Sequence, residues 1–399
     1  MRGTIFCCVS LLGVALFAPR NVMAWDDNGH MIVAIIADHY LLPPAREKIR
    51  VMLSQDADTL TAHYIVSEAT WADKYLESDK ATTHERYDRT YAWHFANIQT
   101  TRPNIPEACF GQPPLPSGTP ASQGPAKDCI VDKISQFAAE LANPATSAKE
   151  RLVALKFLLN LVGDIHEPLR VADENSGHGM LLQVSSAETT PGDLFTFWDR
   201  VLVDRLGMDY HDVANTLVAR ISDADALQWS SSAPQLWALE AHQIGLNQVY
   251  GMLGDYDNQG NSKLQDSDID RGIQIVALQL SRAGVRLAHL LNEALVPASS
   301  QASAQKNVRT GDPAAGRRFA LAACNVCHVV SPQQVIAPSS GLDVTSAPDF
   351  EAIAKTRGMS DVALREFLFG PHPTMPNMHL SQTQANNIIA YILSLQKSR

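Results

Sequence analysis

The sequence predicts a mainly α-helical protein with two domains. Its 399 residues exceed the roughly 250 to 300 residues at which a single hydrophobic core stops growing. Apolar residues recur at helical spacing along most of the chain, whereas strand-like alternation is confined to one short stretch at 180–184. Between Leu291 and Pro313 the residues become small and polar without an apolar period, which is typical of a linker.

These patterns divide the chain into four parts. We expect a signal peptide at 1–24, a helical domain at 25–295, a linker at 296–310 and a small helical domain at 311–399. Helices are expected at 29–53, 149–162, 208–221 and 273–294 in the first domain, and at 317–323, 360–369 and 381–395 in the second.

The composition describes a folded protein without a broad basic surface. With 45% hydrophobic and 19% charged residues, the chain has enough apolar material for two cores. The formal net charge of −10 argues against tight binding of duplex nucleic acid, because such binding needs many Lys and Arg side chains to neutralise phosphates. Binding of a single phosphate at a metal site is compatible with this charge.

Residues 1–24 have the features of a secretory signal. A basic start at Arg2 is followed by an apolar run over 5–17 and by a small residue, Ala24, at an acceptable cleavage site. The alternative is an uncleaved membrane anchor, but the run is shorter than the ~20 residues that a membrane span needs. We therefore expect a periplasmic or secreted bacterial protein that has no transmembrane span once the signal is removed.

The cysteines indicate one disulfide. Of the six cysteines, two lie in the signal and two belong to a motif in the second domain. Cys109 and Cys129 remain, and they bracket a loop rich in Pro and Gly. In an oxidising compartment these two residues are expected to form a disulfide, with two separate thiols as the alternative.

The second domain begins with a haem-attachment motif. In the sequence CNVCH, Cys324 and Cys327 have the spacing at which two thiols form thioethers to haem c, and His328 is positioned to ligate the iron. A redox disulfide or a zinc knuckle is the alternative. No second pair of ligands with zinc spacing follows, which favours haem.

The remainder of this domain, over about 310–399, resembles the single-haem class I cytochromes c. The resemblance rests on the sequence GPHPTMPNM at 370–378 and on the apolar helix that follows. It implies that Met375 is the second axial ligand, with Met378, His372 and His379 as competitors. A thioether ligand raises the reduction potential and suits electron transfer to a redox partner protein or other electron acceptor.

Signal cleavage after Ala24 would make Trp25 the first residue of the sequence WDDNGH, which ends at His30. This start resembles that of the single-strand-specific zinc nucleases of fungi and plants, and of the related zinc phospholipases C. In those families the terminal amine and the carbonyl of the leading tryptophan chelate zinc together with a histidine one turn later. The chemistry is reasonable because an α-amine has a pKa near neutrality and can deprotonate to bind a metal.

Further motifs of that family follow in the same order across about 25–295. They are Trp71-Ala72-Asp73, Trp93-His94-Phe95, the sequence CIV at Cys129, the sequence LVGDIHEPL at 161–169, and Phe197-Trp198-Asp199. The resemblance implies the all-helical fold of the zinc nucleases and phospholipases C.

Three family histidines are absent. The family motif His-x3-Asp-x5-His contains Asn160, Asp164 and Arg170 here. The family motif Asn-Leu-His-x2-Trp-Asp has Phe195 at its histidine position and keeps Asp199. An asparagine oxygen is less suited to zinc than an imidazole nitrogen.

The remaining ligands therefore imply one or two metal ions rather than three. The resemblance implies one site at Trp25, His30 and Asp164, a second at Asp73, His94, Asn160 and Asp164, and a third that retains only Asp199. Asp73 and Asp164 are the expected catalytic carboxylates. The metal is expected to be zinc or another divalent or redox-active ion.

Two other residues in this region have open interpretations. Arg170 could pair with Asp199 or bind a phosphate through two parallel hydrogen bonds, or it could be an ordinary surface arginine. His166 lies inside the aspartate motif and could belong to an altered pocket.

Three functions are compatible with these features. The first is an exported phosphodiesterase-like domain, with altered or impaired cleavage of single-stranded nucleic acid or another phosphodiester, joined to a haem c electron-transfer module. The second is a redox enzyme that holds a metal other than zinc and uses the haem as an electron relay. The third is a non-catalytic binding domain joined to a cytochrome, because a shared fold does not guarantee a shared reaction.

Overall fold

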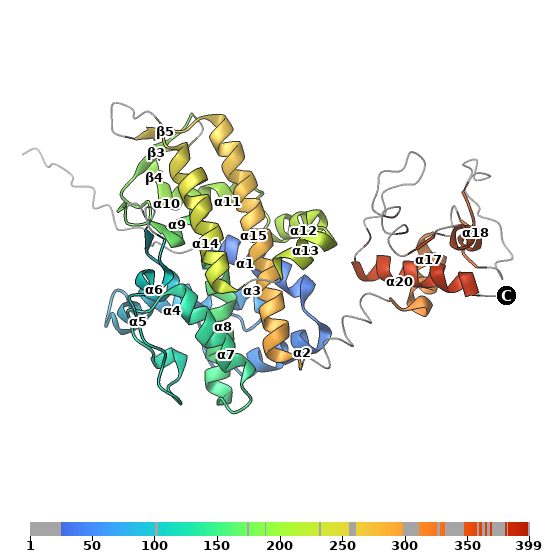
Figure 1. The fold of residues 1–399 in the computed structure, drawn as a ribbon, viewed down its shortest axis with the longest axis horizontal. Helices are drawn as coiled ribbons and strands as arrows, with labels where there is room; N and C mark the ends of the chain where they lie inside the picture. The colour runs from blue at the N-terminus through green and yellow to red at the C-terminus, as the bar shows by residue number, and fades with distance from the viewer. Residues whose placement is uncertain are drawn as a thin grey trace, which may run out of the picture. The chain divides into compact units, whose positions relative to one another are not determined.

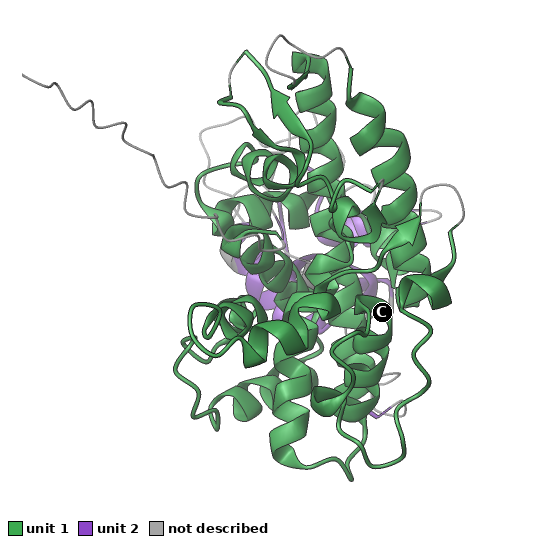
Figure 2. Cartoon of the chain, turned by 90° about the vertical axis from the view of Figure 1, so that its left-hand side faces the viewer, with its two compact units in different colours: residues 1–295 green, residues 296–399 purple. Residues whose placement is uncertain are grey.

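The chain forms two compact units, residues 1–295 and 296–399, which Figure 2 colours separately. The computed structural model describes residues 25–99, 103–173, 175–187, 189–230, 233–254, 261–297, 311–324, 328–331, 347–356, 359–360, 364, 368, 380 and 382–397. The predicted signal peptide, most of the predicted linker and most of the predicted helix at 360–369 lie outside the described residues, as do Cys327 and Met375 with its competitors.

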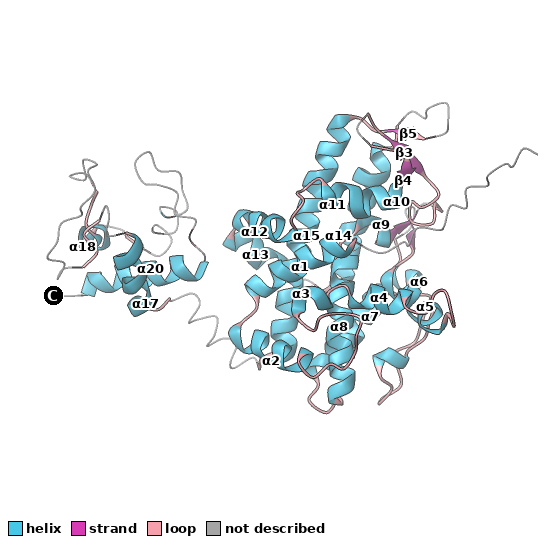
Figure 3. Ribbon diagram, turned by 180° about the vertical axis from the view of Figure 1, so that it is seen from behind, coloured by secondary structure: helices cyan, strands magenta, loops and turns pink. Residues whose placement is uncertain are grey.

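Both units are built mainly from helices (Figure 3), as the sequence predicted. The α-helices of the first unit are α1 (Asp27–Tyr40), α2 (Pro43–Leu53), α3 (Ile65–Glu68), α4 (Trp71–Glu77), α5 (Glu85–Thr90), α6 (Ile105–Ala108), α7 (Ile130–Ala142), α8 (Ala148–Asp164), α9 (Pro168–Val171), α10 (Leu194–Thr196), α11 (Leu202–Asp204), α12 (Tyr210–Arg220), α13 (Asp223–Trp229), α14 (Pro234–Ile244) and α15 (Asp266–Leu295). Shorter helical turns are η1 (Tyr91–His94), η2 (Ala121–Gln123), η3 (Phe197–Val201), η4 (Gly245–Val249) and η5 (Tyr250–Met252).

Two small sheets accompany these helices. Strand β1 (Ile98–Gln99) pairs in parallel with β2 (Ala172–Asp173). In the other sheet, β3 (Gln183–Ser185) pairs antiparallel with β4 (Gly192–Asp193) and parallel with β5 (Ser262–Lys263). Strand β3 overlaps the stretch of strand-like alternation in the sequence.

The predicted helix at 29–53 is two helices, because α1 ends at Tyr40 and α2 begins at Pro43. A proline cannot donate a backbone hydrogen bond and disfavours helical backbone in the residue before it. Leu42 is accordingly extended, and Pro43 occupies the first position of the new helix, where proline is favoured.

Helix α8 is the central helix of the first unit. Ser147 caps its start by accepting a hydrogen bond from the Glu150 backbone N–H, and every residue from Ala154 to Asp164 is buried. A helix that is buried on all sides must be covered by other helices, and α7 packs directly against it. Polar residues in the last turns of α8 are therefore enclosed by the fold.

The long helix α15 runs along much of the first unit (Figure 1) and packs closely against α1. The contact point is Gly284, where an added Cβ atom would lie 2.5 Å from the Ile36 Cβ and 3.1 Å from the Val33 carbonyl oxygen. Because packed helices can approach this closely only where the side chain is absent, glycine is required there. This packing holds the start of α1, and thus His30, in place.

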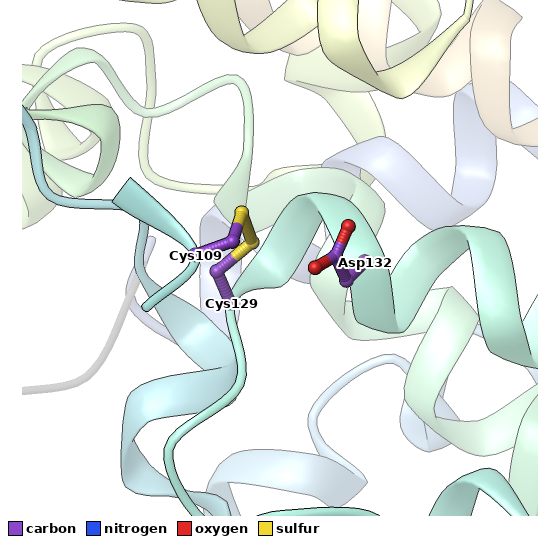
Figure 4. A group of neighbouring side chains, drawn as sticks. All are labelled: Cys109, Cys129 and Asp132. Carbon is purple, nitrogen blue, oxygen red and sulfur yellow. A yellow bond between two sulfur atoms is a disulfide. The ribbon is translucent and has the colours of Figure 1, made fainter. Parts of the chain in front are cut away.

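The predicted disulfide is confirmed between Cys109 and Cys129, which close a loop between α6 and α7. Figure 4 shows Asp132 beside the two sulfur atoms, close enough for the three residues to resemble a metal-binding group. Sulfurs joined to each other are not thiolates, and thiolates are the form of cysteine that binds metals. This group is therefore a covalent crosslink and not a metal centre.

The second unit has its own hydrophobic core. Its described elements are α17 (Pro313–Ala323), α18 (Phe350–Lys355), α20 (Gln382–Ser394) and the turn η7 (Leu395–Lys397). Helix α17 packs against α20, and the Tyr391 hydroxyl donates a buried hydrogen bond to the Val330 carbonyl oxygen at 2.8 Å. Among the described residues of both units, no helix is long and apolar enough to cross a membrane.

We expect the substitution Gly284→Ala to destabilise the first unit by about 1–3 kcal/mol, because the new methyl group must push α1 away from α15. Urea denaturation of the unchanged protein and of the variant measures the difference in the free energy of unfolding. Gly192→Ala is the matched control, since an added Cβ there meets no atom within 4 Å. Equal stability of the Gly284 and Gly192 variants would contradict the close packing described here.

Candidate metal centre

The candidate centre is built on the last turns of α8. Asn160 and Asp164 are one helical turn apart, so their side chains share one face of the helix. Gly163 lies between them, and an added Cβ there would be 2.8 Å from the His30 Nδ1 atom. The absence of a side chain at Gly163 thus lets the His30 ring pack directly against α8.

Three other elements bring ligand-type side chains to this face. His30 comes from the first turn of α1, Asp73 from α4 and His94 from the turn η1. All three residues are fully or almost fully buried, as are Asn160 and Asp164. The structure therefore gathers five predicted ligands that lie up to 134 positions apart in the chain (164 minus 30).

Asp164 is the centre of the contacts. Its Oδ2 accepts a hydrogen bond from His94 Nδ1 at 2.6 Å, and its Oδ1 lies 3.3 Å from His30 Nε2. His30 Nε2 also lies 3.4 Å from Asp73 Oδ2, and His94 Nδ1 lies 3.9 Å from Asp73 Oδ1. Two carboxylates thus face two imidazole rings inside the protein.

Asn160 participates in this cluster as a hydrogen-bond donor. Its Nδ2 donates to Asp73 Oδ2 at 2.6 Å and to the Ala69 carbonyl oxygen at 3.0 Å, and it lies 3.2 Å from His30 Nε2. Its Oδ1, the atom that could ligate a metal, has no hydrogen-bond partner among the described residues. Asn160 therefore positions Asp73 in this arrangement.

Burial and neighbouring charges have opposing effects on the pKa values of these groups. Burial raises the pKa of Asp73, because a carboxylate loses its hydration there. Burial would also raise the pKa of Asp164, but the positive charge of Arg170 and the hydrogen bonds from the two histidines outweigh it and lower the pKa. For His30, the carboxylates likewise outweigh burial and raise the pKa. The cluster thus favours an ionised Asp164 beside positive charge.

The donor types at this cluster are those that divalent metal ions bind. Nitrogen and oxygen ligands that are each ~2.0–2.2 Å from a tetrahedral zinc ion lie roughly 3.3–3.6 Å apart. The separations of 3.3 and 3.4 Å from His30 Nε2 to the two carboxylates have this length, whereas the 2.6 Å contact between His94 Nδ1 and Asp164 Oδ2 is a direct hydrogen bond. In addition, Asp73 Oδ1 and His94 Nε2 have no hydrogen-bond partner among the described residues. Buried polar atoms of this kind are costly unless a ligand satisfies them.

Trp25 is held next to this cluster. Its ring is fully buried and donates a hydrogen bond from Nε1 to the Gly163 carbonyl oxygen at 2.9 Å. It packs against Gly29, where an added Cβ would be 2.6 Å from the Trp25 Cβ. The backbone of residue 25 is therefore fixed between α1 and α8, close to His30.

Asp199 lies in the turn η3 and is not hydrogen-bonded to the cluster among the described residues. Its backbone oxygen accepts a hydrogen bond from the Asp26 N–H at 3.3 Å, and its side-chain Oδ1 has no partner in the described part of the chain. Burial raises its pKa well above the usual range of a carboxyl group. Asp199 is thus held beside residue 26, directly after the predicted ligand Trp25, without a hydrogen bond to the five clustered side chains among the described residues.

Arg170 is buried, so its interpretation as a surface arginine is wrong. Only 2% of its surface is exposed, and its guanidinium carbon lies 4.2 Å from the centre of the Phe95 ring and 5.0 Å from that of Phe195. No described residue accepts a hydrogen bond from its Nε or Nη2. Stacking on aromatic rings contributes up to about 2 kcal/mol, less than the several kcal/mol by which burial destabilises an ion.

His166 is outside the candidate centre. Its Nδ1 donates to the Val162 carbonyl oxygen at 2.7 Å, and its Nε2 accepts from Arg286 Nη1 at 2.8 Å. Burial and the charge of Arg286 lower the pKa of His166 well below its usual range, so the ring is neutral. His166 therefore belongs to a buried network between α8 and α15, and not to an altered pocket at the metal centre.

The first unit also contains a pocket of about 170 Å³. It is lined by Tyr91, Ala92, Phe95, Asn97, Phe110 and His178. Phe95 directly follows the candidate ligand His94, and its ring also stacks on Arg170. Sequence reasoning missed this pocket, because its lining residues come from separate segments; the position of Phe95 next to His94 was the available signal.

In the second unit the structure describes two of the residues predicted to bind haem, one of the attachment cysteines and one axial ligand. Cys324 is at the end of α17 and is half-buried, while the Nδ1 of His328 donates to the Pro348 carbonyl oxygen at 2.8 Å. This bond leaves Nε2 as the ring nitrogen that can ligate a metal. The His328 ring also lies 5.5 Å from the Phe350 ring.

Comparisons with known proteins give two sets of matches. The family model described as S1/P1 Nuclease matches residues 25–296. The chain is 23% identical over 295 residues to Endonuclease 2 of Arabidopsis thaliana, covering 69% of this chain and 92% of that protein. It is 24% identical over 291 residues to Nuclease P1 of Penicillium citrinum, covering 67% and 97%. It is also 36% identical over 95 residues to Cytochrome c-552 of Bradyrhizobium diazoefficiens, covering 24% and 86%.

We expect Asn160→Ala to destabilise the first unit by about 1–3 kcal/mol when a chelator is present, because Asp73 and the Ala69 carbonyl group lose a buried donor. Urea denaturation measures this loss. Asn247→Ala is the control, since that exposed amide bonds only within its own helical segment and should change stability by about 0.5 kcal/mol or less. An equally small effect at Asn160 would contradict its role as donor.

Proposed function

Because the chain belongs to the S1/P1 nuclease family over residues 25–296, we propose that its first unit is a metal-dependent phosphodiesterase that acts on single-stranded nucleic acid. The proposal rests on one observation above all: a fully buried Asp164 carboxylate lies between two histidines, beside a second buried carboxylate. Imidazole and carboxylate groups gathered in this way are the ligands that divalent metal ions take in proteins.

The proposed ligands divide between two adjacent positions. Asp164 would be shared between an ion held with Trp25 and His30 and an ion held with Asp73 and His94. Lewis-acid polarisation of the phosphodiester and activation of water would come from the bound cations. The protein's own contribution is to orient the carboxylates. Asn160 orients Asp73 and the histidines orient Asp164, and the charge of Arg170 together with the histidine hydrogen bonds lowers the pKa of Asp164.

Trp25 enters this proposal through its backbone. Cleavage after Ala24 would release an amine at a residue whose ring is already fixed against Gly163 and Gly29. An amine at that point would need no further ordering before it binds a metal, so little entropy would be lost. Export and maturation would then be steps in the assembly of the site, in a periplasmic or secreted protein. The confirmed disulfide is compatible with such an oxidising compartment.

The aromatic pocket supports a nucleic acid substrate over other phosphodiesters. Three aromatic side chains and an imidazole line it, and one of them follows a candidate metal ligand in the chain. Unpaired bases bind to such rings by stacking, with little dependence on base identity. The nuclease names of the relatives are in line with this choice.

For the second unit we propose a covalent haem c. Cys324 and Cys327 would form the thioethers, His328 and Met375 would be the axial ligands, and the unit would transfer electrons to a redox partner. The hydrogen bond from His328 to Pro348, which directs Nε2 away from the backbone, supports this assignment. So does the similarity to a bacterial cytochrome c-552.

That similarity also favours a second candidate function. Hydrolysis moves no electrons, so a haem in the same chain suits a first unit that holds iron, copper or manganese and reacts by electron transfer. A mixed set of imidazole and carboxylate ligands accepts these metals as well as zinc. Elemental analysis of the purified protein separates the two functions.

We expect the mature protein to contain one or two zinc ions and to cleave single-stranded DNA and RNA. Asp164→Asn should lower the rate by at least about 100-fold, because even weaker disturbances of metal ligands have effects of 10- to 100-fold. It should lower the metal content in parallel. Asp212→Asn is the control, an exposed carboxylate in the first turn of α12. Unchanged activity in the Asp164 variant would contradict the proposed site, and iron or copper in place of zinc would favour the redox function.

We expect haem to stay attached to the second unit after extraction with acidified organic solvent, because thioether bonds survive that treatment. Simultaneous substitution of Cys324 and Cys327 by serine should abolish this retention, and His328→Ala should change the absorption spectrum of the bound haem. A protein that is exported and folded but contains no haem would refute the assignment.

A further inference from the structure

The side chain of Arg170 is a buried cation whose charge no described residue neutralises at close range. Its guanidinium group is enclosed between Phe95 and Phe195, and only 2% of the residue is exposed. Glu167 is the nearest acidic residue in the chain, but its Oε2 accepts from the backbone N–H of Arg170 and not from the guanidinium. No ion pair joins the guanidinium to a described carboxylate.

Three other buried cations of the first unit each have the carboxylate partner that Arg170 lacks among the described residues. Lys133 stacks on Trp93 and lies 3.3 Å from Asp128. Lys156 stacks on Trp71 and lies 3.2 Å from Glu68.

A third case is Arg286, which lies over Trp237 and 2.7 Å from Glu240. Each of these cations combines an aromatic ring with a carboxylate, as expected for a charge that is removed from water. Arg170 has two aromatic rings and lacks the carboxylate, so its anionic partner is to be sought outside the described chain.

The unpartnered atoms of Arg170 identify the kind of anion. Nε and Nη2 have no acceptor among the described residues, and these two nitrogens are on the same edge of the planar guanidinium. Their parallel N–H groups match two oxygens of one phosphate or carboxylate group. The group is therefore oriented for a two-oxygen anion.

The surroundings select a phosphate at the metal centre. The backbone oxygen of Arg170 accepts a hydrogen bond from the Ala96 N–H at 3.0 Å, and its guanidinium lies over the ring of Phe95, which directly follows the candidate ligand His94. The Phe95 ring lines the aromatic pocket and also contacts the Arg170 guanidinium. An anion on Arg170 would thus lie near both a bound cation and a stacked ring, as the phosphate of a nucleotide would.

We propose that the Arg170 guanidinium binds the phosphate group of the substrate through its Nε and Nη2 atoms, as a fixed positive charge in the part of the site where Asp199 is the only remaining family ligand. This inference rests on the proposed function only for the identity of the substrate. Arg170 and Phe195 are two of the three positions at which the family motifs have histidine, so the cation and one of its aromatic neighbours replace two of those ligands together.

The test measures binding of inorganic phosphate to the mature full-length protein by titration calorimetry, with a chelator present so that metal ions do not contribute. We expect Arg170→Met to weaken phosphate binding at least tenfold. Arg170→Lys should retain part of it, because lysine keeps the charge but not the two parallel donors. Arg282→Lys, a substitution elsewhere in the unit, should bind like the unchanged protein.

A second measurement separates binding from a structural role. Thermal unfolding with and without phosphate should show stabilisation by phosphate that is lost in Arg170→Met. The quantity compared is the stabilisation by phosphate and not the unfolding temperature itself, because Arg170→Met removes both a buried ion and the positive charge that lowers the pKa of Asp164. If Arg170→Met does not fold, phosphate affinity and stabilisation by phosphate are compared between Arg170→Lys and the unchanged protein.

The outcomes distinguish this inference from the proposed function. Equal phosphate affinity in the parent and both variants, or no phosphate binding by the parent, would overturn the role of Arg170. Phosphate binding that depends on Arg170 in a protein that cleaves no nucleic acid would sustain this inference and refute the nuclease activity.

Discussion

The Asp164 carboxylate is completely buried and therefore needs opposite charge and hydrogen bonds from the residues around it. A buried ion is stabilised only by close opposite charge and by hydrogen bonds. Asp164 obtains the charge chiefly from Arg170 and the hydrogen bonds from His30 and His94. The two histidines come from α1 and η1, and they reach α8 only because the helices pack closely. Gly163 and Gly284 permit the two closest approaches. Packing and site chemistry are therefore parts of one arrangement.

The same requirement explains the composition around the cluster. Asp73 is held by Asn160, whose amide donates where the related motif has an imidazole. Arg170 lies over the rings of Phe95 and Phe195. Its positive charge lowers the pKa of Asp164 and opposes the rise in the pKa of Asp199 that burial causes.

The two units have separate cores and separate chemical groups. The first unit is organised around α8 and α15, and the second around α17 and α20. The candidate ligands of each unit lie on the elements of that unit. In the second unit His328 is hydrogen-bonded to the Pro348 carbonyl oxygen. The hydrolytic and electron-transfer proposals can therefore be tested one at a time in the same protein.

The sequence by itself determined the helical class, the disulfide between Cys109 and Cys129, and the types of residue at the candidate centre. These features depend on apolar period, on the number of cysteines and on local motifs, all of which can be read along the chain. The helix expected at 149–162 included Asn160 but stopped short of Asp164, and the structure extends α8 to Asp164 and thus puts both residues on one face.

Only the tertiary structure decided which of these residues meet and what surrounds them. It broke the expected helix at 29–53 before Pro43, turned His166 away toward Arg286, and enclosed Arg170 between Phe95 and Phe195. It also formed the aromatic pocket, which no continuous segment encodes. The physical reason is that burial and charge pairing depend on contacts between helices far apart in the chain, whereas sequence spacing specifies only neighbours on the same helix.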